Sequence, residues 1–146
     1  MGGFFGNPET ELLVRWYQAG VFYPFFRAHA HIDAKRREPW LFGEPHTSQI
    51  RDALRLRYQL LPAIYTAFHK SSVSGLPILT FPPSLDIGLR RPQFIQFPED
   101  EKGFAMDDQA YLGDTGILIH PVVKKGATSV TVYLAEDKVG PFSRLY

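Results

Sequence analysis

Four side chains able to do chemistry follow one another at alternate positions directly after an apolar run. They are Arg27, His29, His31 and Asp33. If the chain stays extended there, a period of two residues places all four on one face. Imidazole and carboxylate groups can ligate zinc, whereas an arginine and a histidine at a strand end could bind a substrate at the mouth of a parallel β-barrel.

A structural role is the third interpretation of the same residues. Arg27 would then lie in a buried ion pair, and His29 and His31 would hydrogen-bond to neighbouring loops. The zinc interpretation is the weakest, because this spacing is common and a catalytic zinc needs ligands that converge. The spacing alone leaves substrate contact and structural support open.

The other charged clusters are expected to be exposed to solvent. Asp107 and Asp108 are adjacent, so their carboxylates point in opposite directions on an extended chain and favour a turn over a catalytic pair. The basic triplet at 35–37 is predicted to be an exposed loop. The solvated face of a helix is expected to carry three further arginines, Arg51, Arg55 and Arg57.

Composition excludes several classes of function. The chain of 146 residues has 16 basic and 15 acidic side chains, and a net charge of +1 gives no concentrated positive field for a nucleic acid. It has no cysteine, so disulfides and thiolate nucleophiles are excluded. Its apolar runs are far shorter than the roughly 20 residues that span a bilayer, and its start lacks the pattern of a targeting signal. We therefore expect neither nucleic-acid binding nor membrane insertion.

The first elements expected to position these residues are a helix and a strand. A helix should run from about residue 8 to Gly20, with Asn7 as its cap and Pro8 in its first turn. The continuous apolar run 21–26 then predicts a strand buried on both faces. The sequence around the candidate site therefore predicts a helix followed by a strand that leads into Arg27.

A second helix, over about 47–70, is the most clearly predicted element, with Thr47 or Ser48 as its cap. Its apolar stripe is formed by residues three or four positions apart, namely Ile50, Leu54, Tyr58, Leu61, Tyr65 and Phe68. Further strands are predicted at 76–79, 117–122 and 129–134, the last two joined by a turn around Lys124, Lys125 and Gly126. Residues 80–98 hold four prolines and predict a loop with a domain boundary.

Seven sequence blocks, in order over most of the chain, resemble glycoside hydrolase family 31. They are Gly3–Glu9, Leu13–Gly20, Tyr23–His29, Arg37–Trp40, Arg57–Pro62, Arg91–Phe94 and Asp107–Asp114. The resemblance implies retaining hydrolysis of α-glucosidic bonds, in which one carboxylate attacks the anomeric carbon and another protonates the leaving oxygen. It implies neither a metal nor a cofactor.

The resemblance also implies an α/β fold in two parts. Residues 1–98 would form the last two βα units of a (β/α)8 barrel, with an atypical insertion at about 80–90. Residues 99–146 would begin a β-sandwich domain, cut short at its end. The resemblance thus places the candidate site on the barrel.

Three residues receive substrate-binding roles from this resemblance. His29 would hydrogen-bond the sugar, Arg27 would organise charge beside it, and Phe4 would line the same pocket. His31 and Asp33 would be loop residues, which weakens the zinc interpretation further.

The family's two catalytic aspartates have no counterpart in this sequence, which lacks both the Trp-x-Asp-Met-Asn-Glu and the Gly-Asp-Asn block. We expect both to lie upstream of Met1, so that the chain is part of a longer α-glucosidase and inactive alone. Family members that trim glucose from N-glycans imply an oligosaccharide substrate, a regulatory β subunit and the endoplasmic reticulum lumen. The alternative is a non-catalytic carbohydrate-binding or interaction module with the same fold.

Overall fold

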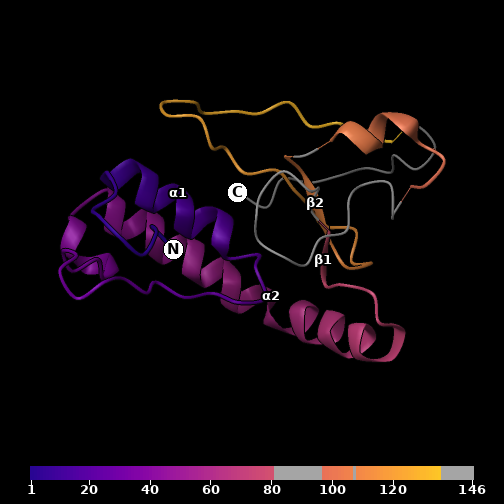
Figure 1. The fold of residues 1–146 in the computed structure, drawn as a ribbon, viewed down its shortest axis with the longest axis horizontal. Coiled ribbons are helices and arrows are strands. Elements are labelled where there is room, and N and C mark those ends of the chain that lie inside the picture. Colours follow the sequence, from indigo (N-terminus) through magenta and orange to yellow (C-terminus); the bar gives the residue numbers. More distant parts are fainter. Residues whose placement is uncertain (81–96, 107, 136–146) are drawn as a thin grey trace.

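Two packed helices and a small sheet make up the ordered core of the chain (Figure 1). The computed structural model describes residues 1–80, 97–106 and 108–135. In chain order the elements are α1 (Thr10–Gly20), the 3-10 helix η1 (Pro39–Phe42), α2 (His46–Ser74), β1 (Leu79–Thr80), the 3-10 helix η2 (Glu101–Ala105), β2 (Ala110–Leu112) and β3 (Leu118–Ile119). Helix α1 packs on the N-terminal half of α2, and the sheet lies toward the other end of α2.

The sheet is antiparallel and has the order β1-β2-β3. Leu79 pairs with Leu112, and Ala110 pairs with Ile119. The strands predicted at 76–79 and 117–122 are therefore present only in short form. The parallel barrel pairing that the fold prediction required does not occur within the residues that the structure describes.

Segment 21–26, predicted as a buried strand, forms turns instead. The N–H groups of its first three residues donate to carbonyl oxygens near the end of α1 at distances from 2.9 to 3.5 Å. Arg57 donates to three carbonyl oxygens of the same segment. Val21 and Phe22 are buried as the prediction required, but these bonds satisfy much of the backbone without a neighbouring strand.

Segment 129–134 is a second strand prediction that the structure corrects. The buried side chain of Gln109 donates from Nε2 to the Tyr133 carbonyl at 2.8 Å and accepts from the Tyr133 N–H at 3.0 Å. A side-chain amide carries both a donor and an acceptor, so it takes the place of a paired strand here. The predicted turn is present and is closed by a hydrogen bond from the Ala127 N–H to the Lys124 carbonyl at 3.1 Å.

Both helices begin differently from the prediction. Helix α1 begins at Thr10, and Asn7 does not cap it, because the Asn7 Oδ1 atom accepts a hydrogen bond from the Lys35 N–H at 2.7 Å. Helix α2 begins at His46, and the Thr47 hydroxyl donates to the Pro39 carbonyl at 3.1 Å. The Asn7 side chain therefore joins two loops, and the Thr47 side chain joins α2 to η1, instead of capping the helices.

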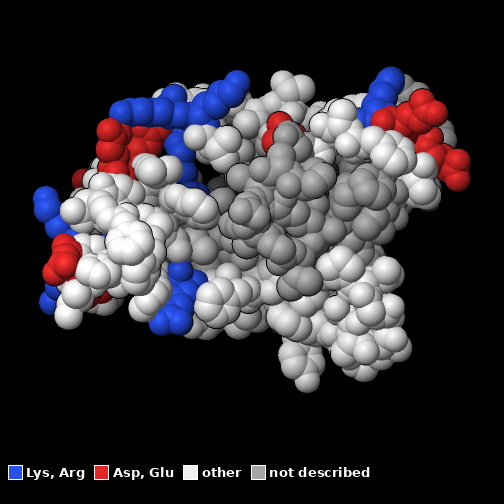
Figure 2. Space-filling model, viewed as in Figure 1, with Lys and Arg blue, Asp and Glu red and all other residues white. Residues whose placement is uncertain are grey.

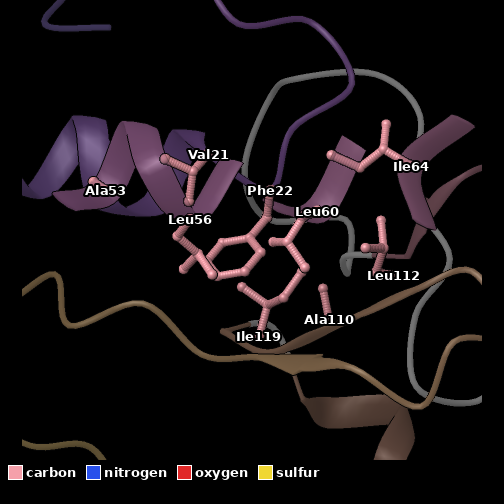
Figure 3. Packing of buried hydrophobic residues seen from close by; sticks show 9 residues of the cluster. All are labelled: Val21, Phe22, Ala53, Leu56, Leu60, Ile64, Ala110, Leu112 and Ile119. Carbon is pink, nitrogen blue, oxygen red and sulfur yellow. The ribbon is translucent and has the colours of Figure 1, made fainter. Parts of the chain in front are cut away.

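The main core lies between α2, the sheet and the turns after α1 (Figure 3). Its buried members are Val21, Phe22, Ala53, Leu56, Leu60, Ile64, Ala110, Leu112 and Ile119. A second cluster joins α1 to α2 through Leu13, Val14, Tyr17 and Ile50. The loop carrying the candidate site is thus anchored at one end in a packed core.

Only the first part of the apolar stripe predicted for α2 is buried, because Ile50 lies in the second cluster and Leu54 packs against it, whereas the rest of the stripe is exposed. Tyr58 and Tyr65 are 72% and 79% exposed, whereas Ala53 and Leu60 pack in the core. Helix α2 is apolar on two faces: the buried face is aliphatic, and the exposed face carries Tyr58, Leu61, Tyr65 and Phe68. Within the described ranges, no helix is both long and apolar enough to cross a membrane.

A set of polar contacts fixes the turn at 124–127 to α1. Arg15 donates to the carbonyl oxygens of Val122 and Ala127 at 2.8 Å each, and its guanidinium lies 2.7 Å from a carboxylate oxygen of Glu11. The Gly126 N–H donates to the same Glu11 oxygen at 2.8 Å. Acidic and basic side chains adjoin over this part of the molecule, at the upper left of Figure 2.

We expect Glu11→Gln to lower the melting temperature modestly at pH 7, and the difference to shrink below pH 4.5. The Gly126 N–H and the Arg15 side chain lower the pKa of Glu11 below its ordinary value of 4.5. A lowered folded-state pKa stabilises the fold above the ordinary value, and this contribution is lost as the pH falls through the lowered value. Thermal melts between pH 3 and 8 measure it, with Glu101→Gln as the control. Equal melting of both variants at pH 7 would contradict the role of Glu11.

Candidate functional site

The structure brings the three predicted sugar-binding residues together from two loops. One loop, 2–7, precedes α1, and the other, 26–33, follows the turns after α1. The ring centroids of Phe4 and His29 lie 5.3 Å apart, and Arg27 Nη2 lies 3.1 Å from His29 Nδ1. All three residues are exposed to solvent.

The contact with Arg27 determines which nitrogen of His29 can donate. A guanidinium group has only donors, so Nδ1 of His29 must accept the hydrogen bond. Neutral His29 therefore carries its proton on Nε2. The exposed imidazole can then donate from Nε2 to an oxygen of a bound molecule.

His31 belongs to the same cluster. The period of two predicted it on one face with Arg27 and His29, whereas the family resemblance gave it no site role. Its ring centroid lies 5.7 Å from that of Phe4 and 5.4 Å from that of Phe5. Its N–H donates to the Phe4 carbonyl at 2.8 Å and so ties the two loops together. We name the residues Phe4, Phe5, Arg27, His29 and His31 the aromatic-histidine cluster.

The zinc interpretation receives no support from this geometry. His31 Nδ1 accepts from the Asp33 N–H at 3.3 Å, and His29 Nδ1 is bonded to Arg27. Across residues 1–80, 97–106 and 108–135, no group of three His, Cys, Asp or Glu residues is arranged to hold a metal ion. The cluster has the features of an organic-ligand surface, with aromatic faces and one directed donor.

Arg37 corrects the prediction that the basic triplet is an exposed loop. Its residue is 7% exposed, and it donates to the carbonyl oxygens of Gly3 and Gly6 at 2.8 and 2.9 Å. Both glycines have positive φ angles, 80° and 72°, which places them in a conformation that favours glycine. Arg36, by contrast, is exposed and pairs with Glu38 at 2.6 Å. Arg37 therefore holds the loop that carries Phe4.

Arg57, also predicted to be solvated, is partly buried in the structure. Its Nη1 donates to the carbonyl oxygens of Val21 and Tyr23 at 2.8 and 2.7 Å, and its Nη2 donates to that of Pro24 at 3.3 Å. The guanidinium carbon also lies 4.8 Å from the centroid of the Phe26 ring. Partial burial lowers the pKa of this guanidinium. Arg57 thus fixes the segment that leads into Arg27.

The helical position of Arg57 is the signal that could have shown this role. It lies four residues after Ala53 and three before Leu60, and both of these are buried. Arg51 and Arg55 lie on the exposed side, as predicted, with contacts to Asp52. Once the buried face of α2 is known, Arg57 is the arginine that borders it.

Of the two adjacent aspartates, Asp108 lies among the residues that the structure describes. Asp107 lies outside the described residues. Asp108 is exposed, in keeping with the prediction, and its Oδ2 atom lies 3.3 Å from Nε2 of the mostly buried His120. That histidine contact was not predicted.

Comparison with known proteins gives two family matches, which together cover most of the chain. Residues 1–67 match the Glycosyl hydrolases family 31 TIM-barrel domain. Residues 87–143 match the Glycosyl hydrolase family 31 C-terminal domain. The chain belongs to glycoside hydrolase family 31. The family predicted from the seven sequence blocks is thereby confirmed, and so is the order of its two parts.

Curated relatives in this family are α-glucosidases. Glucosidase 2 subunit alpha of Schizosaccharomyces pombe is 57% identical over 139 residues, which are 95% of this chain and 14% of that protein. Neutral alpha-glucosidase AB of Homo sapiens is 51% identical over 134 residues, 92% of this chain and 13% of that protein. The chain is homologous to a part of family 31 α-glucosidases and spans about 14% of their length.

Solved structures of an α-glucosidase subunit also match most of this chain. The DNJ-bound and Glc1Man2-bound structures of glucosidase II alpha subunit each match with a TM-score of 0.81 and 53% identity. The match covers 91% of this chain and 13% of each of those chains. The ligands named for those structures are therefore bound by proteins much longer than this chain.

Proposed function

We propose that this chain supplies one wall of the glucose-binding site of a retaining α-glucosidase. The observation that carries the proposal is the assembly of Phe4, Arg27 and His29 by two loops in the region that matches the family's barrel domain. An exposed aromatic face suits the apolar side of a sugar ring, and a directed donor suits one of its hydroxyl groups. In such a site Phe4 packs on the sugar and His29 donates from Nε2.

The bond-breaking step needs groups that the cluster does not provide. Retaining hydrolysis uses two carboxyl groups about 5–5.5 Å apart, one as nucleophile and one as acid and base. Among the described residues, Asp33 contacts the cluster through His31. We infer that both catalytic carboxylates belong to other parts of the enzyme. His29 and Phe4 then act by orienting the sugar and by bonding more strongly in the transition state.

The substrate we propose is an oligosaccharide with a terminal α-linked glucose, of the kind trimmed from N-glycans. Two observations support this: the α-glucosidases among the relatives, and the structure of glucosidase II alpha subunit described as Glc1Man2-bound. The same relationship supports the endoplasmic reticulum lumen as the compartment and a regulatory β subunit as the partner. The chemistry needs no cofactor.

The proposed setting for the chain is the end of a (β/α)8 barrel. The second apolar face of α2, with Tyr58, Leu61, Tyr65 and Phe68 exposed, supports it, because a helix that is apolar on two faces is normally covered on both. The division at 98/99 into barrel and β-sandwich stays a prediction, and β1 pairs with β2 across it. The predicted insertion at 80–90 lies, apart from Thr80, outside the described residues.

A graft into a complete enzyme tests the proposed function. In this experiment the 146-residue chain replaces the matching segment of the S. pombe glucosidase 2 subunit alpha. We expect the graft to keep kcat/KM for an α-glucoside within about tenfold of the parent, that is, within about 1.4 kcal/mol of transition-state stabilisation. A graft that melts like the parent but lacks activity would contradict the proposal. Glucose binding by the free chain, with an inactive graft, would favour the non-catalytic module.

A further inference from the structure

We infer that Arg57 and Arg37 are positioning residues that hold the two loops of the aromatic-histidine cluster in register with each other. The inference rests on the proposed function, because the cluster is taken to be the sugar-binding wall. Neither arginine belongs to the cluster itself. Arg37 binds the backbone of the loop 2–7, and Arg57 binds the backbone of the turns that lead into the loop 26–33.

The first series of contacts leads from Arg57 to His29. One guanidinium group holds the backbone of Val21, Tyr23 and Pro24 and lies over the ring of Phe26. The next residue in the chain is Arg27, whose side chain bonds to His29. The direction in which Arg27 leaves the core is therefore set by Arg57.

The second series of contacts leads from Arg37 to Phe4. The two carbonyl oxygens that Arg37 binds, those of Gly3 and Gly6, lie on either side of Phe4 in the sequence. The two loops are joined where the His31 N–H donates to the Phe4 carbonyl at 2.8 Å. Phe4 and His29 thus face each other because two separate arginines fix their loops.

Arginine is required at both positions for a geometric reason. A guanidinium group is planar and carries five donors, so it can bond several carbonyl oxygens at different angles at once. Lysine carries its donors on one atom at the end of a flexible stem and cannot reproduce this arrangement. Methionine keeps much of the apolar stem and removes every donor. The two substitutions separate the geometry from the charge.

Nuclear magnetic resonance on the 146-residue chain tests the positioning directly. Cross-relaxation between the ring protons of Phe4 and His29 reports the 5.3 Å centroid distance. We expect Arg57→Met and Arg57→Lys to weaken this signal at least twofold, and Arg55→Met to leave it unchanged. Arg37→Met should weaken it as well, with Arg36→Met as its control. An unchanged signal in a folded Arg57→Met or Arg57→Lys chain would overturn the inference.

Kinetics in the graft test the consequence for catalysis. A misplacement of about 1 Å can cost about 100-fold in rate, so we expect Arg57→Met to lower kcat/KM roughly 10- to 100-fold and Arg55→Met less than about twofold. Arg57→Lys should recover melting temperature more fully than kcat/KM, which separates positioning from general stability. Equal kcat/KM in the Arg57→Lys and unsubstituted grafts would overturn the inference. If the unsubstituted graft is inactive while the resonance signal responds to Arg57, the proposed function fails and the positioning role stands.

Discussion

The 146-residue chain alone is expected to show no α-glucosidase turnover, at a level on the order of a million-fold or more below the graft. Removing all the catalytic groups of an enzyme lowers kcat on this scale, and the remaining binding groups supply only a small residual rate enhancement. Here the nucleophile and acid blocks of the family do not occur in the sequence. The measurement is hydrolysis of a chromogenic α-glucoside by the purified chain.

The control for this experiment is the His29→Ala chain, purified in the same way. A trace of contaminating glucosidase gives the same rate in both preparations. Turnover that persists through purification in the unsubstituted chain and disappears in His29→Ala would contradict the account, because the chain would then contain its own catalytic carboxylates.

In the graft, His29→Ala is expected to lower kcat/KM roughly 10- to 1000-fold, or about 1.4 to 4 kcal/mol of transition-state stabilisation. The reason is the donor at Nε2, which the Arg27 contact fixes and which alanine removes. His31→Ala provides the matched control, since both imidazoles pack on Phe4 and the His31 contact that ties the loops is made by its backbone N–H. Its effect should be much smaller.

Two outcomes of the histidine comparison would contradict the role of His29. Equal losses in His29→Ala and His31→Ala would mean that aromatic packing, and not a directed donor, accounts for the effect. Activity that follows bound zinc would restore the metal interpretation. Zinc content and kcat/KM are therefore measured on the same preparations.

Sequence reasoning predicted the helices and the family better than the strands. Helix periodicity is local, so α1 and α2 were both placed within a few residues of their observed bounds. A strand needs a neighbour, and an apolar run cannot show whether one is present. Only Val21 and Phe22 of segment 21–26 are buried as predicted, whereas Phe25 is exposed. The backbone of the segment bonds to α1 and to Arg57 instead of to a strand.

The sequence named three residues of the candidate site, whose sugar-binding role stays a prediction, but it did not name the residues that support them. Phe4, Arg27 and His29 were assigned through the family resemblance, and the structure places them together. Arg37 and Arg57 were predicted to be solvated because charged residues usually are. Their acceptors are backbone carbonyl oxygens of distant segments, which the sequence does not identify. Only the position of Arg57, between buried Ala53 and Leu60, could have indicated that it is partly buried.

The most direct test of the central claim is a crystal structure of the graft with DNJ bound. The account predicts His29 Nε2 within hydrogen-bond distance of a ligand oxygen, about 2.7–3.2 Å, with the ring of Phe4 against the ligand and Arg27 still bonded to His29 Nδ1. A ligand bound in the active site without contact to Phe4, Arg27 or His29 would contradict it.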